Sequence, residues 1–141
     1  YKFSDALCIS LQLINHLQDV KDDYQSLNRI YLPDEWMFSA KVNIESLNNK
    51  SEDSSLRLVF NQVLDKVDYL MADARQLPRS LSSKRLSIEV AAIIGIADAL
   101  IHRLRKRDLL GNRVELSKIE YCWFCFLGAV KSLCSIRKNN F

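Results

Sequence analysis

Apolar side chains recur at three- and four-residue spacing along most of this chain, the pattern of amphipathic helices. The clearest run spans about residues 52–77, and three further helices are expected at about 4–24, 84–106 and 116–136. No segment alternates with the two-residue period of a half-buried strand. The pattern therefore predicts an all-α helical bundle. The apolar positions of the clearest run are Leu56, Val59, Phe60, Val63, Val67, Leu70, Met71 and Ala74.

Capping residues and chain breakers predict where these helices end. Ser4 is the expected N-cap of the first helix, and Pro78 is expected to stop the second. The third helix should end at the cationic run 103–107 before Gly111. Its centre, residues 90–97, is almost wholly apolar, which predicts burial on most sides. Residues 25–51 read as a loop followed by a mixed stretch.

Composition fits this picture. The chain has 141 residues, of which 48% are hydrophobic and 26% charged, so one folded domain is expected rather than disorder. Only three glycines and two prolines are present, too few for the many turns of a sandwich or barrel. The longest uncharged apolar run, residues 121–130, is half the length of a membrane span. Four cysteines without a disulfide framework favour a reducing compartment, hence a cytoplasmic location.

Charge is divided unevenly between the two halves of the chain. Residues 1–74 hold seven Lys and Arg against twelve Asp and Glu, a balance of −5. Residues 75–141 hold thirteen against five, a balance of +8. An anionic partner could bind the basic half directly or the acidic half through a metal ion.

A cation-free polar stripe follows one side of the first helix. At 100° per residue its members fall within a sector of about 80°, and the rest of the helix surface is mostly apolar. A solvated face normally carries cations as well, so we expect the stripe to line a polar cavity. His16 borders it, and we weigh contact with that cavity against a purely structural role. The stripe consists of Asp5, Cys8, Gln12, Asn15, Asp19 and Asp23.

Three oxygen donors of this stripe form a ladder. Asn15, Asp19 and Asp23 stand at i, i+4 and i+8, and Asp22 adds a carboxylate to the same turn. Like charges at this spacing repel, and acids near a helix C-terminus oppose its dipole. A divalent cation would reverse both penalties, and such hard oxygen ligands suit Mg²⁺. The alternative is a solvated acidic helix end without a ligand.

The ladder and the loop after it resemble the second aspartate-rich signature of squalene/phytoene synthases. The order, spacing and helix-then-loop context match that family. The stretches 72–81 and 114–118 are similar too, so the resemblance covers most of the chain. The matching positions are Gln12, Asn15, Asp19, Asp23, Arg29, Tyr31 and Pro33.

Gln18 distinguishes branches of the family. Most members have Arg immediately before the first Asp of this motif, whereas this chain has Gln18. The string Leu17-Gln18-Asp19 resembles the hydroxysqualene synthase branch of bacterial hopanoid and squalene biosynthesis. That resemblance implies conversion of presqualene diphosphate to hydroxysqualene or squalene.

The resemblance also implies roles for individual residues. Asn15, Asp19 and Asp23 would hold Mg²⁺, with Asp19 and Asp23 as the catalytic carboxylates. Arg29 and Tyr31 would bind the diphosphate of a prenyl diphosphate substrate, such as farnesyl or presqualene diphosphate. The substrate-binding set would be completed by Gln12 and Gln18.

Family members place another aspartate-rich helix before this region, and no counterpart is found here. Asp34-Glu35 and Asp65–Asp68 have the wrong spacing and context. We therefore expect residues 1–141 to be the C-terminal portion of a synthase domain, inactive and marginally stable without its N-terminal half.

Two other functions stay open. One is a non-catalytic interaction or assembly factor on the same scaffold, although the intact ladder argues against it. The other is a helical bundle that binds a partner through residues 121–130, whose aromatic side chains we instead expect in the core or a tunnel wall.

Three minor features complete the sequence-based expectations. Cys122 and Cys125 have the spacing of a metal or redox pair but lack further ligands, so buried packing is expected. His102 should lie on the surface. The basic run 103–107 has no nucleic-acid motif and is expected to be a solvated helix end. Contact with anionic lipid on the inner face of the membrane remains an option.

Overall fold

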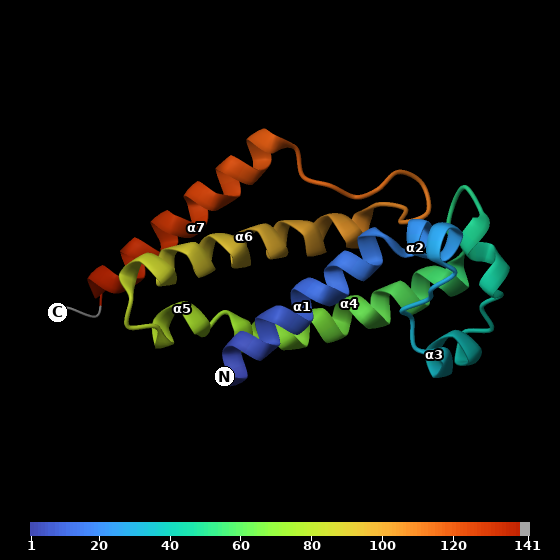
Figure 1. Ribbon diagram of the computed structural model, residues 1–141, viewed down its shortest axis with the longest axis horizontal. Coiled ribbons are helices and arrows are strands. Elements are labelled where there is room, and N and C mark those ends of the chain that lie inside the picture. The colour runs from blue at the N-terminus through green and yellow to red at the C-terminus, as the bar shows by residue number, and fades with distance from the viewer. Residues whose placement is uncertain (139–141) are drawn as a thin grey trace.

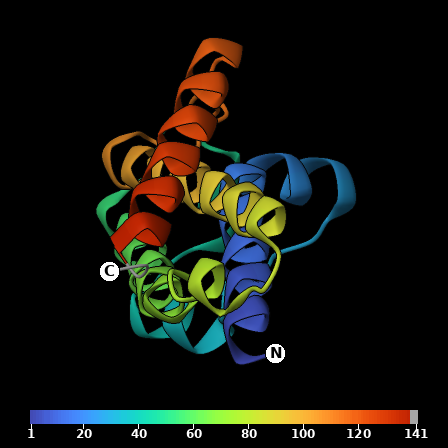
Figure 2. The ribbon, with the colours of Figure 1, turned by 90° about the vertical axis from the view of Figure 1, so that its left-hand side faces the viewer.

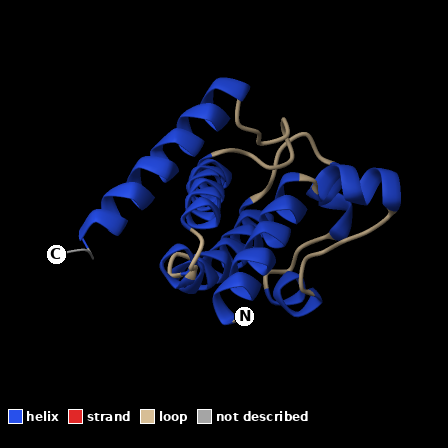
Figure 3. Ribbon diagram, turned by 60° about the vertical axis from the view of Figure 1, so that its left-hand side comes forward, coloured by secondary structure: helices blue, strands red, loops and turns tan. Residues whose placement is uncertain are grey.

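The computed structural model describes the backbone of residues 1–138 and the side chains of residues 1–127 and of Val130. Throughout this part of the chain the regular elements are helices and no strand occurs, which confirms the all-α prediction (Figure 3). In chain order they are α1 (Lys2–Gln18), α2 (Val20–Leu27), α3 (Asp34–Ser39), the 3₁₀ helix η1 (Ile44–Asn48), α4 (Ser54–Ala74), α5 (Leu77–Ser80), α6 (Lys84–Lys106) and α7 (Lys118–Lys138).

Helix α4 forms the centre of the bundle. Helix α1 lies along it, α6 packs beside this pair, and α7 covers the outer side of α6 (Figures 1 and 2). The short elements α2, α3 and η1 gather at one end (Figure 1). One hydrophobic core joins α1, α4 and α6, because each contributes fully buried side chains to it: Leu17 from α1, Phe60 and Met71 from α4, and Leu104 from α6.

Side-chain caps set the starts of two long helices. Asp53 accepts a hydrogen bond from the Leu56 N–H at 2.7 Å before α4, and Ser83 accepts from the Leu86 N–H at 3.3 Å before α6. These bonds satisfy amide groups that have no partner within the helix.

Two expected helix boundaries were wrong. The first helix begins at Lys2, and Ser4 donates to the Tyr1 carbonyl at 2.7 Å instead of capping. Helix α4 ends at Ala74, and Pro78 lies in the first turn of α5, where its missing N–H costs nothing.

The single helix expected over residues 4–24 is divided at Asp19. This residue has φ −102° and ψ 5°, outside the helical range, and separates α1 from α2. The backbone stays bonded across the break, since the Asp19 N–H donates to Asn15 at 3.0 Å and the Asp23 N–H donates to Asp19 at 2.8 Å. Helix α2 ends at Leu27, and its C-cap residue Asn28 has a left-handed φ of 49°. The break is therefore a local bend within the ladder of Asn15, Asp19 and Asp23.

Burial of α6 agrees with the prediction, whereas burial of α7 is lower than predicted. In the apolar centre of α6, residues 90–97, Ile93 is 40% exposed and the other residues are buried or half-buried, so the helix is covered on most sides. On α7, Phe124 is half-buried and Cys122 is exposed, so the expected burial of Cys122 was wrong. The other aromatic side chains, expected in the core or a tunnel wall, are exposed: Tyr121 by 41%, Trp123 by 58% and Phe126 by 60%.

The basic run at the end of α6 is not simply solvated. Arg105 pairs with Asp65 at 2.8 Å and with Asp68 at 2.6 Å on α4. Arg103 pairs with Glu120 on α7. These ion pairs link α6 to both neighbours, while His102 is exposed as expected.

A polar cluster fixes the connector that follows α6. Arg57 pairs with Glu52 and donates to the carbonyls of Leu104, at 2.9 Å, and Arg107. The Leu109 N–H donates to Glu52 at 3.3 Å. Burial raises the pKa of the Glu52 carboxyl, although the bonds from Leu109 and Arg57 oppose that shift. The cluster directs residues 107–117 back toward the break between α1 and α2.

Candidate active site

The two ladder carboxylates face different partners. Asp19 accepts an ion pair from Arg113, whose Nε lies 2.8 Å from Asp19 Oδ1. Arg113 also pairs with Glu115 at 3.0 Å. Asp23 lies 4.0 Å from the imidazole of His16, measured from Oδ2 to Nδ1. The bend at Asp19 therefore separates two carboxylates that share one sector in a straight helix.

The connector over residues 107–117 is tied to both sides of this bend. Gln18 Nε2 donates to the Val114 carbonyl at 2.5 Å. Lys21 Nζ donates to the Leu110 carbonyl at 2.8 Å and to that of Asn49 at 2.9 Å. Gln18, expected to contact substrate, thus holds the connector in this structure.

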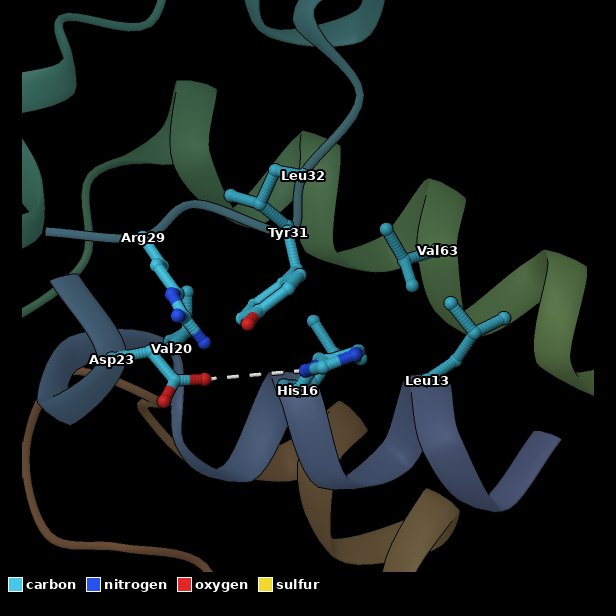
Figure 4. A pocket seen from close by; sticks show the side chains of 9 residues that line it. Leu13, His16, Val20, Asp23, Arg29, Tyr31, Leu32 and Val63 are labelled. Carbon is cyan, nitrogen blue, oxygen red and sulfur yellow. Dashed lines mark ion pairs between the residues drawn. The ribbon is translucent and has the colours of Figure 1, made fainter. Parts of the chain in front are cut away.

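A small pocket that is open to solvent lies beside the bend. Asp23, Arg29 and Tyr31 of the expected site converge on it, together with His16 (Figure 4). Its remaining walls are apolar: Leu13, Leu17, Val20, Leu32 and Val63. The pocket thus combines a charged and aromatic mouth with an apolar base.

His16 occupies a central place in this pocket. Its ring stacks on Tyr31 with the centroids 3.8 Å apart and the planes inclined by 17°. Its Nδ1 is buried and has no hydrogen-bond partner among the described residues. The 4.0 Å to Asp23 is too long for a hydrogen bond. An unsatisfied buried polar atom costs about 1–3 kcal/mol, so its retention calls for an explanation.

The four N-terminal residues of the stripe do not enter the pocket. Asp5, Cys8, Gln12 and Asn15 are exposed on the side of α1 that faces away from the core. Within the described chain they therefore do not line the cavity that the sequence predicts. Asn15 and Asp19 lie one helical turn apart, and neither is among the residues that line the pocket.

The chemistry of the ladder fits a hard cation. The Asn15 amide and the Asp19 and Asp23 carboxylates offer oxygen donors, and the bend turns Asp19 toward Arg113 and Asp23 toward His16. No group of three or more His, Cys, Asp or Glu side chains is arranged to hold a metal among the residues whose side chains are described. Two carboxylates plus an amide suit Mg²⁺, which commonly keeps waters and takes phosphate oxygens as further ligands.

Sequence reasoning missed Arg113 and gave His16 only a marginal place. Arg113 stands 94 positions after Asp19 in the chain, so no local spacing connects them. For His16 the available signal was its position one residue after Asn15, on the border of the stripe.

The match to a known family agrees with this arrangement. The profile of the squalene/phytoene synthase family matches residues 1–120, which include the ladder, the pocket and the connector. The chain belongs to the squalene/phytoene synthase family. Among curated relatives, it is 36% identical over 132 residues to a hydroxysqualene synthase of Rhodopseudomonas palustris, covering 94% of this chain and 45% of that protein.

Two other relatives extend the comparison. A hydroxysqualene synthase of Zymomonas mobilis is 34% identical, with 96% of this chain and 46% of the relative covered. A bifunctional lycopene cyclase/phytoene synthase of Aspergillus oryzae is 30% identical over 81% of this chain and 21% of the relative. The chain spans less than half the length of the curated relatives that it matches. No solved structure gives a significant match.

Proposed function

We propose that this chain forms the second half of a Mg²⁺-dependent active site that processes a prenyl diphosphate. The observation that carries the proposal is the convergence of Asp23, Arg29 and Tyr31 on one pocket beside Asp19 (Figure 4). Asp23 lies on α2 and the other two lie on the loop that follows it, within the stretch that the family profile matches.

The side chains have distinct parts in this proposal. Asn15, Asp19 and Asp23 hold Mg²⁺, which would neutralise charge on the diphosphate leaving group when bound. Arg29 offers a planar fork of donors that can bind two phosphate oxygens at once. Tyr31 would donate a hydrogen bond from its hydroxyl group to a third phosphate oxygen, since its hydroxyl points toward Arg29 in Figure 4. Gln12 is exposed on α1 like Asn15 and would extend the polar surface of the site.

For the substrate we propose presqualene diphosphate, converted to hydroxysqualene, since conversion to squalene would additionally need a hydride donor. Its C–O bond to diphosphate breaks, and water supplies the hydroxyl of hydroxysqualene while releasing a proton. The apolar pocket walls, such as Leu13 and Val20, would contact hydrocarbon and limit the access of other water molecules. Support for this branch comes from the names of the similar bacterial relatives and from Gln18.

The remainder of the site is proposed to come from sequence beyond this chain. Because the chain covers less than half of each relative, an opposing aspartate-rich helix would face the exposed stripe and complete the metal site. The protein would act in the cytoplasm, with peripheral membrane contact. None of the helices among the described residues is long and apolar enough to cross a bilayer.

The test uses the protein expressed from its complete reading frame. Asp19→Asn should lower Mg²⁺-dependent diphosphate release from presqualene diphosphate by about a hundredfold or more, because it removes a metal ligand. Asp22→Asn is the matched control, since Asp22 is exposed, lies on the same turn and is outside the ladder. Equal activity of Asp19→Asn and Asp22→Asn at saturating Mg²⁺ would contradict the proposal. Absence of Mg²⁺ and diphosphate binding in the unmodified protein would instead favour the non-catalytic alternative.

A further inference from the structure

His16 lies next to two residues of the proposed site, Tyr31 and Asp23. One face of its ring stacks on Tyr31 at 3.8 Å, and its Nδ1 points at Asp23 across 4.0 Å (Figure 4). Tyr31 is in the proposed diphosphate-binding group and Asp23 in the proposed metal-binding group. One imidazole therefore joins the two groups.

The surroundings of His16 leave its Nδ1 without another partner. Leu13, Leu17 and Val20 form the neighbouring pocket walls and offer no side-chain acceptor or donor. The Asp23 carboxylate is the polar group that this nitrogen faces. A shift of about 1 Å would bring the two atoms to hydrogen-bond distance. The arrangement costs free energy as it stands and gains a bond when Asp23 moves toward the imidazole.

We propose that His16 is a positioning residue that orients the Asp23 carboxylate through Nδ1 and the Tyr31 phenol through its ring. This inference rests on the proposed function, because it assigns His16 to the same metal and diphosphate groups. Carboxylates that bind metals are commonly held by such an outer hydrogen bond, which fixes the direction of their lone pairs. Stacking similarly fixes the plane of Tyr31 and with it the direction of the phenol O–H.

The two contacts can be removed separately. His16→Phe keeps a planar ring for Tyr31 but has no nitrogen for Asp23. His16→Asn keeps a polar atom near the position of Nδ1 but has no ring for Tyr31. His102→Phe is the control, since His102 is exposed on α6 and lies outside the pocket. Thermal melts of all variants establish that they fold.

The probes are Mn²⁺ alone and inorganic pyrophosphate at saturating Mn²⁺, titrated into the protein from its complete reading frame. For His16→Phe we expect the Mn²⁺ dissociation constant to rise about tenfold, with pyrophosphate affinity within about twofold of the unmodified protein. For His16→Asn we expect the reverse, with Mn²⁺ affinity nearly kept and pyrophosphate binding about fivefold weaker. His102→Phe should change neither constant.

This crossed pattern separates positioning from general support of the fold. Equal losses in both titrations, failure of both variants to fold, or no change in either titration would overturn the inference while leaving the proposed function standing. If the unmodified protein binds neither Mn²⁺ nor pyrophosphate, the proposed function fails and the inference fails with it.

Discussion

Arg113 and Asp19 form an ion pair, Nε to Oδ1 at 2.8 Å, that joins the connector after α6 to the bend between α1 and α2. The guanidinium occupies Oδ1, one of the two carboxylate oxygens of Asp19. Arg113 is 47% exposed and also pairs with Glu115, so its charge would stay solvated and paired after it leaves Asp19. If Asp19 binds Mg²⁺ as proposed, the pair would compete with the cation for the same carboxylate.

Arg113→Gln is expected to strengthen Mn²⁺ binding by about three- to tenfold, because it removes this competing positive charge. The measurement is a Mn²⁺ titration of the protein from its complete reading frame, without substrate. Lys118→Gln removes the same charge from an exposed position and should change the affinity by less than about twofold. Weaker Mn²⁺ binding in Arg113→Gln would mean that Arg113 orients Asp19 rather than competing for it.

The cluster around Arg57 should be a major source of stability. Arg57→Met leaves the Glu52 carboxylate and the carbonyls of Leu104 and Arg107 without their donor. We expect a loss of about 3 kcal/mol in the free energy of unfolding, measured by urea titration. Arg85→Met is the control: its pair with Glu89 is solvent-exposed and should contribute less than about 1 kcal/mol. Equal effects of the two substitutions would contradict the structural assignment.

Glu120 should make the stability of α7 depend on acid pH. Hydrogen bonds from the Ser117 hydroxyl and N–H, at 2.7 and 2.9 Å, hold the pKa of Glu120 below its usual 4.5, with Arg103 adding to the shift. A depressed pKa means that the folded state binds the proton more weakly than the unfolded state. The stabilisation is therefore present above the usual pKa and is lost as the pH falls through the folded value.

Glu120→Gln is accordingly expected to be less stable than the unmodified protein at about pH 7, with the difference shrinking toward about pH 3. Thermal melts across this range provide the measurement. Glu35→Gln, at an exposed position in the first turn of α3, serves as the control for loss of a carboxylate. A stability difference for Glu120→Gln that is the same at both pH values would show that ionisation is not involved.

The outward side of α7 should promote association of the isolated chain. Trp123 and Phe126 are 58% and 60% exposed and lie 6.3 Å apart between ring centroids. The double substitution Trp123→Ser and Phe126→Ser should reduce aggregation, measured by size-exclusion chromatography, with little change in melting temperature. Phe124→Ser should instead lower the melting temperature, because Phe124 is half-buried and packs against the core. Unchanged aggregation of the double variant would mean that another surface, and not this side of α7, drives association.

Helix periodicity predicted the long elements well because burial enforces it. Every apolar position named for residues 52–77 is buried in α4 except Leu70, which is half-buried against the core. Boundaries were predicted less well. At the N-terminus Ser4 had the right chemistry for a cap, but Tyr1 precedes the helix instead. Capping preference is worth only about 1 kcal/mol, which tertiary packing readily overrides.

The candidate site divides in the same way. The local motif identified Asp23, Arg29 and Tyr31, which meet in one pocket because they are eight residues apart or fewer. Arg113 could not be found from spacing, since its partner Asp19 is in another part of the chain. The bend at Asp19 was also missed, because local sequence favours continuing the helix and the connector contacts lie on both sides of the break.

The bonds between the connector and the first helix have a consequence for how the site assembles. Gln18 reaches Val114 across 96 positions of sequence, and Lys21 reaches Leu110 across 89. Contacts of such long range are slow to form, because a long loop must close before they contribute. During synthesis the aspartates of the ladder emerge before the backbone of residues 110–114 that braces their bend, which follows only after α6 is complete. The acidic turn would therefore lack the hydrogen bonds from Gln18 and Lys21 to the connector until late in folding, and its final conformation would be among the last features of the molecule to form.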